Sequence, residues 1–252
     1  MKKIFLQAEW RKLLMINYEV DPKIIQPFIP AHTQLDLYNG KCLISIVGFM
    51  FLNTKIKGFK IPMHVNFEEV NLRFYITHKT QVGVIKRGTT FIKEIVPKRA
   101  ITFVANTLYN EKYVTRPMAH DINVSKETLE VSYKWNNDGK TNIIACKAAN
   151  KLQTIVANSI EEFITEHYWG YTFISDTKTS EYAVEHPRWQ CYPVTDIEID
   201  VDFEKLYGND FAHLKAQKPH SVILAEGSEI LVREGLKLFN APNPSNFGLN
   251  CL

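Results

Sequence analysis

The chain has 252 residues, of which 45% are apolar, so it can form one large domain or two small ones with a substantial core. Lys and Arg number 30 against 27 for Asp and Glu, and this weak, scattered excess argues against nucleic acid as a partner. No run approaches the roughly 20 apolar residues that span a bilayer, so we expect no membrane partner. The sequence leaves open whether the protein is a monomer or a homo-oligomer.

The cysteines predict reduced thiols. Cys42, Cys146, Cys191 and Cys251 form no C-x-x-C pair and have no His at metal-ligand spacing, so we expect no metal site and no cofactor. The N-terminal apolar stretch is interrupted as early as Gln7, which argues against a secretory signal peptide. These features together predict a cytoplasmic protein.

The first part of the chain predicts strands separated by turns. Residues 12–18 are mostly apolar and are followed by Asp21-Pro22, which predicts a short helix to Phe28 because Asp suits the N-cap and Pro the first helical position. Asn39-Gly40 predicts a hairpin turn. The long apolar run of residues 42–52 is typical of a strand buried on both faces.

The strand over residues 69–77 is the most informative segment, since polar and apolar side chains alternate along it without a break. Successive strand side chains point to opposite faces, so Glu69, Asn71 and Arg73 fall in one row. If this row faces water, it is the outer side of an ordinary half-buried sheet, which is the commoner arrangement. If it faces the inside of a barrel, an acid, an amide and a guanidinium form a binding site.

The second part of the chain predicts further strands and short helices. Residues 82–96 predict a strand that a hairpin or bulge interrupts at Lys86-Arg87-Gly88, and a helix follows Pro97 with Asn110 as its expected end. Ser159 and Glu162 form a capping box for another helix. The remaining predicted strands cover residues 129–135, 142–148, 171–174, 182–184, 195–203 and 221–225.

About ten strands with two or three short helices, in one continuous pattern, predict a mainly β (α+β) fold. We expect a single antiparallel β-barrel or a strongly curved sheet, with the helices packed on its outside. Residues 1–240 would form this one domain. Residues 241–252 are rich in Asn, Pro and Gly and would form a flexible C-terminal tail.

No motif of a known reaction occurs, whether a phosphate-binding loop, a zinc-binding H-E-x-x-H or a nucleophile elbow. In Lys98-Arg99 the adjacent cation could lower the pKa of the lysine, as Schiff-base chemistry needs, although two exposed cations are the commoner outcome. His186 lies beside a proline and near Trp189, and it could act as an acid or base near neutral pH. A hydrogen-bonded structural histidine is the commoner outcome there.

A set of short segments occurs in an order shared with a known family: residues 10–14, 20–30, Leu35-Asp36, Glu69–Tyr75, Glu161–Tyr168 and Val184–Pro187. Together they resemble the YqjF-like family of uncharacterised proteins, which is similar in fold to acetoacetate decarboxylase. The resemblance extends from about Trp10 to about Ser228, nearly the whole chain.

This resemblance implies a closed or cone-shaped β-barrel with a small-molecule cavity inside. It therefore favours the inward orientation of Glu69, Asn71 and Arg73. It also implies that Arg11 faces the cavity, since Arg11 falls where the decarboxylases carry an active-site arginine. In the better of two alignments Tyr113 falls at the place of the Schiff-base lysine, and a phenol cannot form an imine.

One function and two alternatives follow. We expect a cavity that binds a small, anionic or carbonyl-bearing molecule without Schiff-base decarboxylase activity. One alternative is a ligand-free structural or interaction module whose polar row is a satisfied buried network. The other is a lysine-dependent decarboxylase that uses Lys98 or Lys112. The candidate ligand-binding residues are Arg11, Glu69, Asn71, Arg73, Tyr113 and His186.

Overall fold

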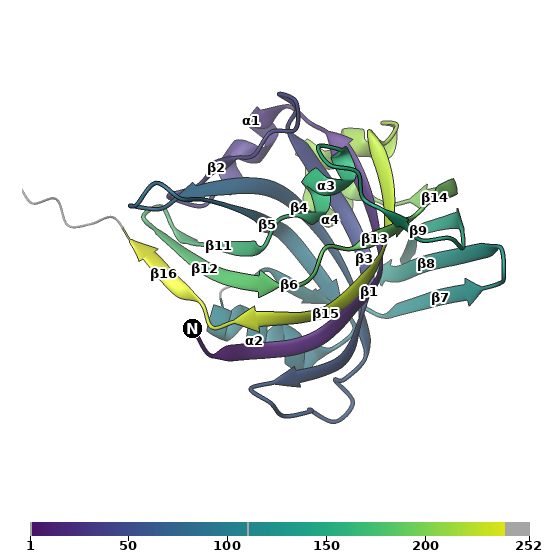
Figure 1. Cartoon of the computed structure of the whole chain (residues 1–252), viewed down its shortest axis with the longest axis horizontal. Helices are drawn as coiled ribbons and strands as arrows, with labels where there is room; N and C mark the ends of the chain where they lie inside the picture. The colour runs from purple at the N-terminus through teal and green to yellow at the C-terminus, as the bar shows by residue number, and fades with distance from the viewer. Residues whose placement is uncertain (1, 110, 240–252) are drawn as a thin grey trace, which may run out of the picture.

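The structure, a computed structural model, describes residues 2–109 and 111–239, and strands dominate it (Figure 1). Within this part of the chain, the larger of two sheets has 12 strands. Its main path, neighbour by neighbour, is β10 (Gln153–Thr154), β13 (Gln190–Tyr192), β15 (Ser221–Arg233), β1 (Ile4–Glu19), β3 (Leu43–Ile56), β4 (Phe67–Lys79), β5 (Ile85–Val96), β11 (Trp169–Ser175), β12 (Lys178–Glu185) and β16 (Leu236–Phe239). Off this path, β2 (Gln34–Leu35) pairs with β4, and β6 (Tyr113–Thr115) pairs with β5.

A smaller sheet and short helices complete the fold. The smaller sheet has the order β14 (Val194–Asp200), β9 (Lys140–Ala149), β8 (Thr128–Asn137) and β7 (Met118–Val124). The helices are α1 (Pro22–Ile25), η1 (Gln26–Phe28), α2 (Arg99–Tyr109), α3 (Ile160–Thr165), α4 (Phe203–Tyr207) and η2 (Asn209–Lys215). None of the helices in the described residues has the length and apolar character that crossing a bilayer requires.

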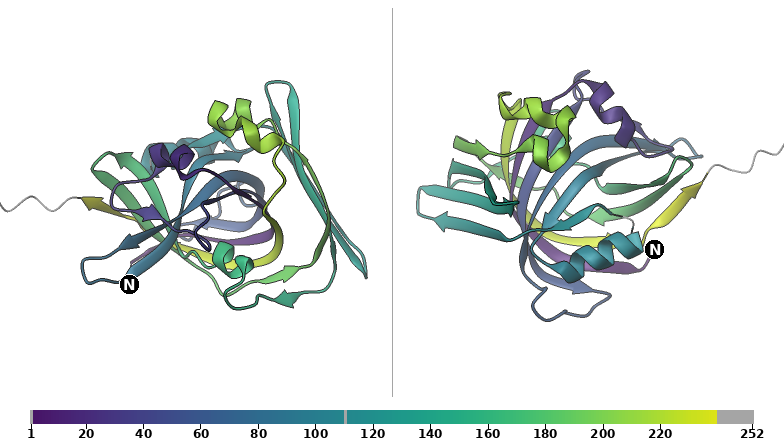
Figure 2. Two further views of the ribbon diagram at one scale, coloured as in Figure 1. Left: turned by 90° about the horizontal axis from the view of Figure 1, so that it is seen from above. Right: turned by 180° about the vertical axis from the view of Figure 1, so that it is seen from behind.

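The larger sheet is strongly curved, and its strands wrap around a common interior (Figure 2). β12 meets β15 over only two residue pairs, Val184 with Val232 and Glu185 with Leu231. Two pairings, β5 with β6 and β5 with β11, are parallel, because α2 and the longer segment after it return the chain in the same direction. The expected mainly β, curved sheet is therefore confirmed. The expected purely antiparallel pairing is wrong, since the sheet is mixed.

The two helix N-caps predicted from the sequence, Asp21 and Ser159, are confirmed. The Asp21 side chain accepts a hydrogen bond from the Lys23 amide at 2.9 Å and starts α1, with Pro22 at the first position. The Ser159 hydroxyl accepts one from the Glu162 amide at 3.2 Å and starts α3. The expected helix end at Asn110 and the expected tail lie outside the described residues.

β5 differs from the expectation in a way that matters for the interior. It continues through Lys86, Arg87 and Gly88, so the interruption expected there is wrong. Gly88 serves close strand packing instead, because a Cβ atom on it would lie 2.6 Å from the Trp169 carbonyl oxygen of β11. The irregularity lies farther on, where Ile92 falls between two residues paired with β4, and this β-bulge reverses the facing of the later residues.

The main hydrophobic core lies between the two sheets, outside the interior. Tyr133 and Trp135 of β8 are each at most 1% exposed and pack towards β1 and β3. Gly48 allows this approach, since a Cβ atom on it would lie 2.6 Å from the Tyr133 ring. The Tyr133 hydroxyl donates a hydrogen bond to the Lys12 carbonyl oxygen at 2.8 Å. The outer face of β4 joins the same core, and the inner face is left for the cavity.

Candidate functional site

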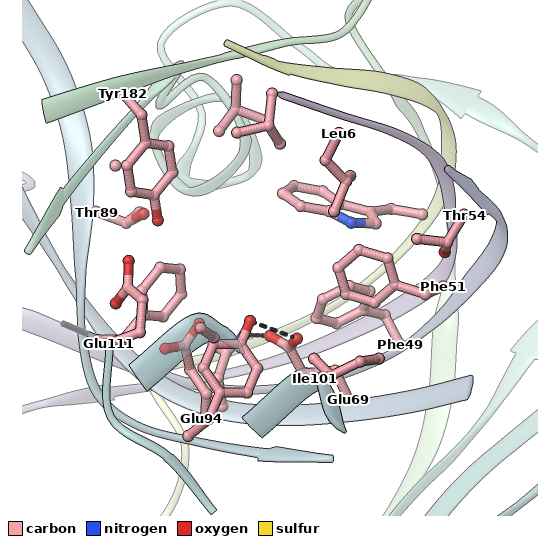
Figure 3. A pocket seen from close by; sticks show the side chains of 18 of the residues that line it. Leu6, Phe49, Phe51, Thr54, Glu69, Thr89, Glu94, Ile101, Glu111 and Tyr182 are labelled. Atoms are coloured by element: carbon pink, nitrogen blue, oxygen red, sulfur yellow. Dashed lines mark hydrogen bonds between the residues drawn. The ribbon is translucent and has the colours of Figure 1, made fainter. Parts of the chain in front are cut away.

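A cavity of about 200 Å³ lies inside the curved sheet (Figure 3). Residues from β1, β3, β4, β5, β11, β12 and β15 form its walls. The helix α2 contributes Ala100, Ile101 and Val104, spaced so that one helical face is presented to the cavity. The cavity therefore exists because the sheet bends around it and a helix covers part of it.

The polar row of β4 lines this cavity. Glu69, Asn71 and Arg73 are 3%, 1% and 8% exposed, and all three are lining residues. The apolar residues between them, such as Val70 and Leu72, are fully buried in the core between the sheets. Both faces of β4 are therefore covered, and the alternative of a solvated polar face is wrong.

Glu69 is held by two neutral donors. The Asn71 amide nitrogen donates to its Oε1 at 2.9 Å, and the Tyr113 hydroxyl donates to its Oε2 at 3.0 Å. Burial raises the pKa of Glu69 to about 7, opposed by these two hydrogen bonds and reinforced by the charge of Glu111. Glu69 can therefore gain or lose a proton near neutral pH.

Two more carboxyl groups lie on the same side of the cavity. Glu94 pairs across the sheet with Asn71, and the Ile92 bulge sets it on the same face as Phe91. The Glu111 Oε1 accepts a hydrogen bond from the Thr172 hydroxyl at 2.6 Å. Burial and then the charges of neighbouring carboxylates raise the pKa of Glu94 well above its ordinary value, and burial likewise raises the pKa of Glu111.

Arg73 is a buried cation whose guanidinium lies 5.8 Å from the centre of the Tyr75 ring. Its Nη2 contacts the Met15 sulfur at 3.5 Å, and its Nε has no hydrogen-bond partner among the described residues. Ser45 lies directly opposite on β3, but its hydroxyl is engaged with Asn17 and Tyr75. The guanidinium of Arg73 therefore has N–H donors at the cavity wall that bond to no protein group described. Such donors are suited to hydrogen-bond a carboxylate.

His64, His167 and His186 line the cavity as well. His167 bonds through Nε2 to Asp36 at 3.0 Å, and burial lowers its pKa to about 4 despite that carboxylate, with Arg87 and Arg73 adding to the lowering. His186 stacks on Trp189 with ring centroids 4.2 Å apart. Burial also lowers the pKa of His186. The rings of His167 and His186 are therefore neutral near pH 7.

The opposite wall is apolar and aromatic. Leu6, Phe49 and Phe51 face the side that carries Glu111 and Tyr182 (Figure 3). The Trp10 ring packs edge-on against Phe49 and Phe51, with centroids 5.4 and 5.8 Å away. Among the described residues, the lining therefore has an acidic wall, an aromatic wall and the buried cation Arg73, besides Arg233, which is ion-paired with Glu185.

Arg11 does not line the cavity, and the expectation that it would is wrong. Its guanidinium bonds to Glu9 at 2.6 Å and lies 3.7 Å from Glu226, with the side chain 30% exposed. Lys12 adopts a left-handed φ of 54° at a register shift in β1, so Trp10 and Leu13 face the cavity and Arg11 faces away.

Neither candidate Schiff-base lysine lies in the cavity, whose lining among the described residues contains no lysine. Lys98 precedes α2 and accepts, through its backbone oxygen, from the Thr102 amide. The Lys112 ammonium lies 5.5 Å from the centre of the Phe28 ring, outside the lining, and burial lowers its pKa. Tyr113, in contrast, lines the cavity where the alignment places the lysine.

Sequence reasoning did not identify Glu94, Glu111, Tyr182 and His167. The Ile92 bulge hides Glu94, because simple alternation assigns it to the face of Ile92. Glu111 lies in a connection where neither the helical nor the strand period applies. The inward orientation of Tyr182 could have been predicted from the sequence. Tyr182 and Val184 lie two residues apart on a predicted strand and therefore share a face, and both line the cavity.

The fold has the architecture of acetoacetate decarboxylase-like proteins. The acetoacetate decarboxylase of Legionella pneumophila superposes with a TM-score of 0.62 at 12% identity, over 93% of this chain and 87% of that one. The enduracididine biosynthesis enzyme MppR, in complex with pyruvate, superposes with a TM-score of 0.64 at 9% identity, over 94% and 91%. Likeness at such low identity defines the fold and not the reaction.

Sequence comparison adds the family. DUF2071, described as an uncharacterized conserved protein, matches residues 7–229. The chain is 26% identical over 184 residues to the uncharacterized protein YqjF of Bacillus subtilis strain 168, which covers 72% of this chain and 73% of that protein. The protein belongs to the DUF2071 family, and the family resemblance predicted from the short segments is confirmed.

Proposed function

We propose that the protein binds a small anionic or carbonyl-bearing molecule in the cavity, and that Arg73 receives its negative charge. The single observation behind this proposal is that Arg73 is buried in the cavity wall with an Nε that has no partner in the described part of the chain. A buried charge without a partner is unfavourable, so a carboxylate that pairs with it binds with a large gain. The planar fork of donors suits such a group bidentately.

The neighbours of Arg73 support the same assignment. The Asn71 Oδ1 atom is buried without a hydrogen-bond partner among the residues described, and it is available to a ligand donor. Glu69, Tyr113 and His186 line the same space, and we assign them to ligand contact. MppR holds pyruvate in a related fold, and a cavity of about 200 Å³ suits a molecule of that order of size.

We further propose that this chain has no Schiff-base decarboxylase activity. Lysine chemistry needs an amine that touches the substrate carbonyl, and no lysine lines the cavity among the described residues. Tyr113 could donate a hydrogen bond or a proton to a bound carbonyl, because burial keeps its pKa well above the ordinary value and its hydroxyl neutral. We also retain a cytoplasmic location as a proposal, supported by the free thiols of Cys42, Cys146 and Cys191.

Calorimetric titration with pyruvate and with valerate tests the proposal. We expect Arg73→Met to weaken binding by about tenfold or more, because the charge-assisted hydrogen bonds are lost. Arg11→Met is the matched control, because Arg11 lies on β1 and its side chain is outside the cavity lining. This substitution should change the affinity for either acid by less than about twofold. Equal affinities for wild type and Arg73→Met, or no binding of either acid, would favour the ligand-free structural module.

A further inference from the structure

We infer that the ligand carries, besides the anionic group held by Arg73, a cationic amino group held by Glu94 and Glu111, so that the natural ligand is a short ω-amino acid. This inference rests on the proposed function and narrows its ligand class. The observation behind it is that the cavity is also lined by carboxyl groups, those of Glu94 and Glu111, to which the proposed function assigns no role.

Glu94 carries the inference. It is 2% exposed, it lines the cavity, and its Oε2 atom has no hydrogen-bond partner in the described part of the chain. Burial and the neighbouring carboxylates hold Glu94 as the neutral acid, with Tyr113 and Glu111 as its hydrogen-bonding neighbours. An ammonium group at the Oε2 atom would supply the missing donor and a compensating charge, so that Glu94 could ionise when the ligand binds. Glu111 and Glu69 lie on the same side of the cavity, so the donor that best relieves this site is positively charged (Figure 3).

The aromatic wall makes an organic cation the better occupant. Phe49 and Phe51 stand across the cavity from Glu111 and Tyr182, and Trp10 packs against both phenylalanines (Figure 3). Aromatic faces attract ammonium groups and cover alkyl chains, which a hydrated metal ion would not use. The described residues also provide no group of three His, Cys, Asp or Glu side chains placed to hold a metal ion.

The spacing of the charged groups selects among amino acids. Glu94 pairs with Asn71, and Arg73 lies two residues farther along β4. Two strand residues span roughly 7 Å. A ligand that reaches both Arg73 and Glu94 must therefore place several carbons between its carboxylate and its amino group. An α-amino acid, which carries both groups on one carbon, cannot satisfy both positions.

Calorimetric titration with three matched compounds tests the inference: δ-aminovalerate, valerate without the amine, and norvaline with the amine at the α-carbon. We expect wild type to bind δ-aminovalerate about tenfold or more tightly than valerate, and norvaline no more tightly than valerate. Glu94→Gln should bring δ-aminovalerate within about twofold of valerate without weakening valerate. Glu68→Gln is the control, since Glu68 lies on β4 outside the cavity, bonded to His120, and it should preserve the difference.

The outcomes separate this inference from the proposed function. Valerate binding that depends on Arg73, with no gain from the terminal amine, overturns the ω-amino acid and leaves the carboxylate site in place. A gain that persists in Glu94→Gln also overturns it, because the amine would then bind elsewhere. Failure of both acids to bind overturns the proposed function itself.

Discussion

Glu69 and Arg73 lie in one row on β4, and their hydrogen bonds go to different partners. Glu69 accepts hydrogen bonds from Asn71 and Tyr113, whereas Arg73 reaches the sulfur of Met15. Asn71 lies between them and spends its amide nitrogen on Glu69. The hydrogen bonds of the row therefore do not join Glu69 to Arg73, as the proposed ligand site requires.

A double-mutant cycle of Arg73→Met and Glu69→Gln should show little coupling in the free energy of unfolding. Breaking a buried ion pair costs about 3–5 kcal/mol, whereas removing an unpaired buried cation should cost less than about 1 kcal/mol or stabilise the fold. Chemical denaturation measures all four proteins. Strong destabilisation by both single changes, with coupling above about 1 kcal/mol, would mean a structural ion pair and would remove the binding-site interpretation.

The raised pKa of Glu69 predicts that stability falls as pH rises. The unfolded chain releases this proton near the ordinary glutamate pKa of 4.5, but the folded protein holds it until about 7. The free energy of unfolding should therefore decrease between these values and stay lower above them, by on the order of 1–3 kcal/mol. Glu69→Gln should flatten part of this decrease in denaturation experiments, with Glu94 and Glu111 causing the rest. An unchanged pH profile in Glu69→Gln would contradict the assignment.

At the scale of elements, the inward row of β4 could be predicted because that strand alternates without irregularity. β1 and β5 could not be read in the same way, since each carries a bulge that reverses the facing of later residues. The bulge at Lys12 puts Leu13 on the same face as Trp10, with Arg11 on the other face, and the bulge at Ile92 turns Glu94 inward. A single extra residue leaves no clear mark in composition or period, which is why Glu94 was missed. The expected placement of Arg11 came from the family resemblance and not from the pattern of the strand.

The close approach of β11 to β5 gives a prediction of its own. Gly88→Ala should destabilise the protein by about 1–3 kcal/mol, because the new methyl group would meet the Trp169 carbonyl and the Tyr171 ring and force the strands apart. Gly235→Ala is the matched control, with its nearest atom, the Glu181 carbonyl oxygen, 3.2 Å away. Thermal unfolding compares the two. Equal, small effects would mean that the β5–β11 contact tolerates separation.

At the scale of the whole molecule, the sequence predicts the mainly β character and the curvature well. The local patterns indicate most of the long strands, but they miss β7 and the short strands β6, β10, β13 and β16. They also give no strand its partner, so the second sheet and the parallel pairings of β5 could not be predicted. The volume of the cavity depends on this curvature and on the position of α2, which no single segment encodes. The interpretation of residues 1–240 as one domain remains a proposal.

The absence of lysine from the described lining predicts the outcome of a chemical trap. Treatment with borohydride in the presence of acetoacetate or pyruvate should leave the intact mass unchanged, because no imine forms on a phenol such as Tyr113. An adduct mapped by peptide mass spectrometry to Lys98 or Lys112 would contradict this and restore the lysine-dependent decarboxylase. Lys112 is the more informative of the two, because burial lowers its pKa and increases the fraction of free amine.

A crystal structure of the protein soaked with valerate tests the central proposal most directly. We expect electron density for the acid inside the cavity, with its carboxylate accepting hydrogen bonds from the Arg73 guanidinium and its alkyl chain along Phe49 and Phe51. Density for the acid only outside the cavity, or an Arg73 side chain turned to pair with Glu69 in a water-filled interior, would contradict it.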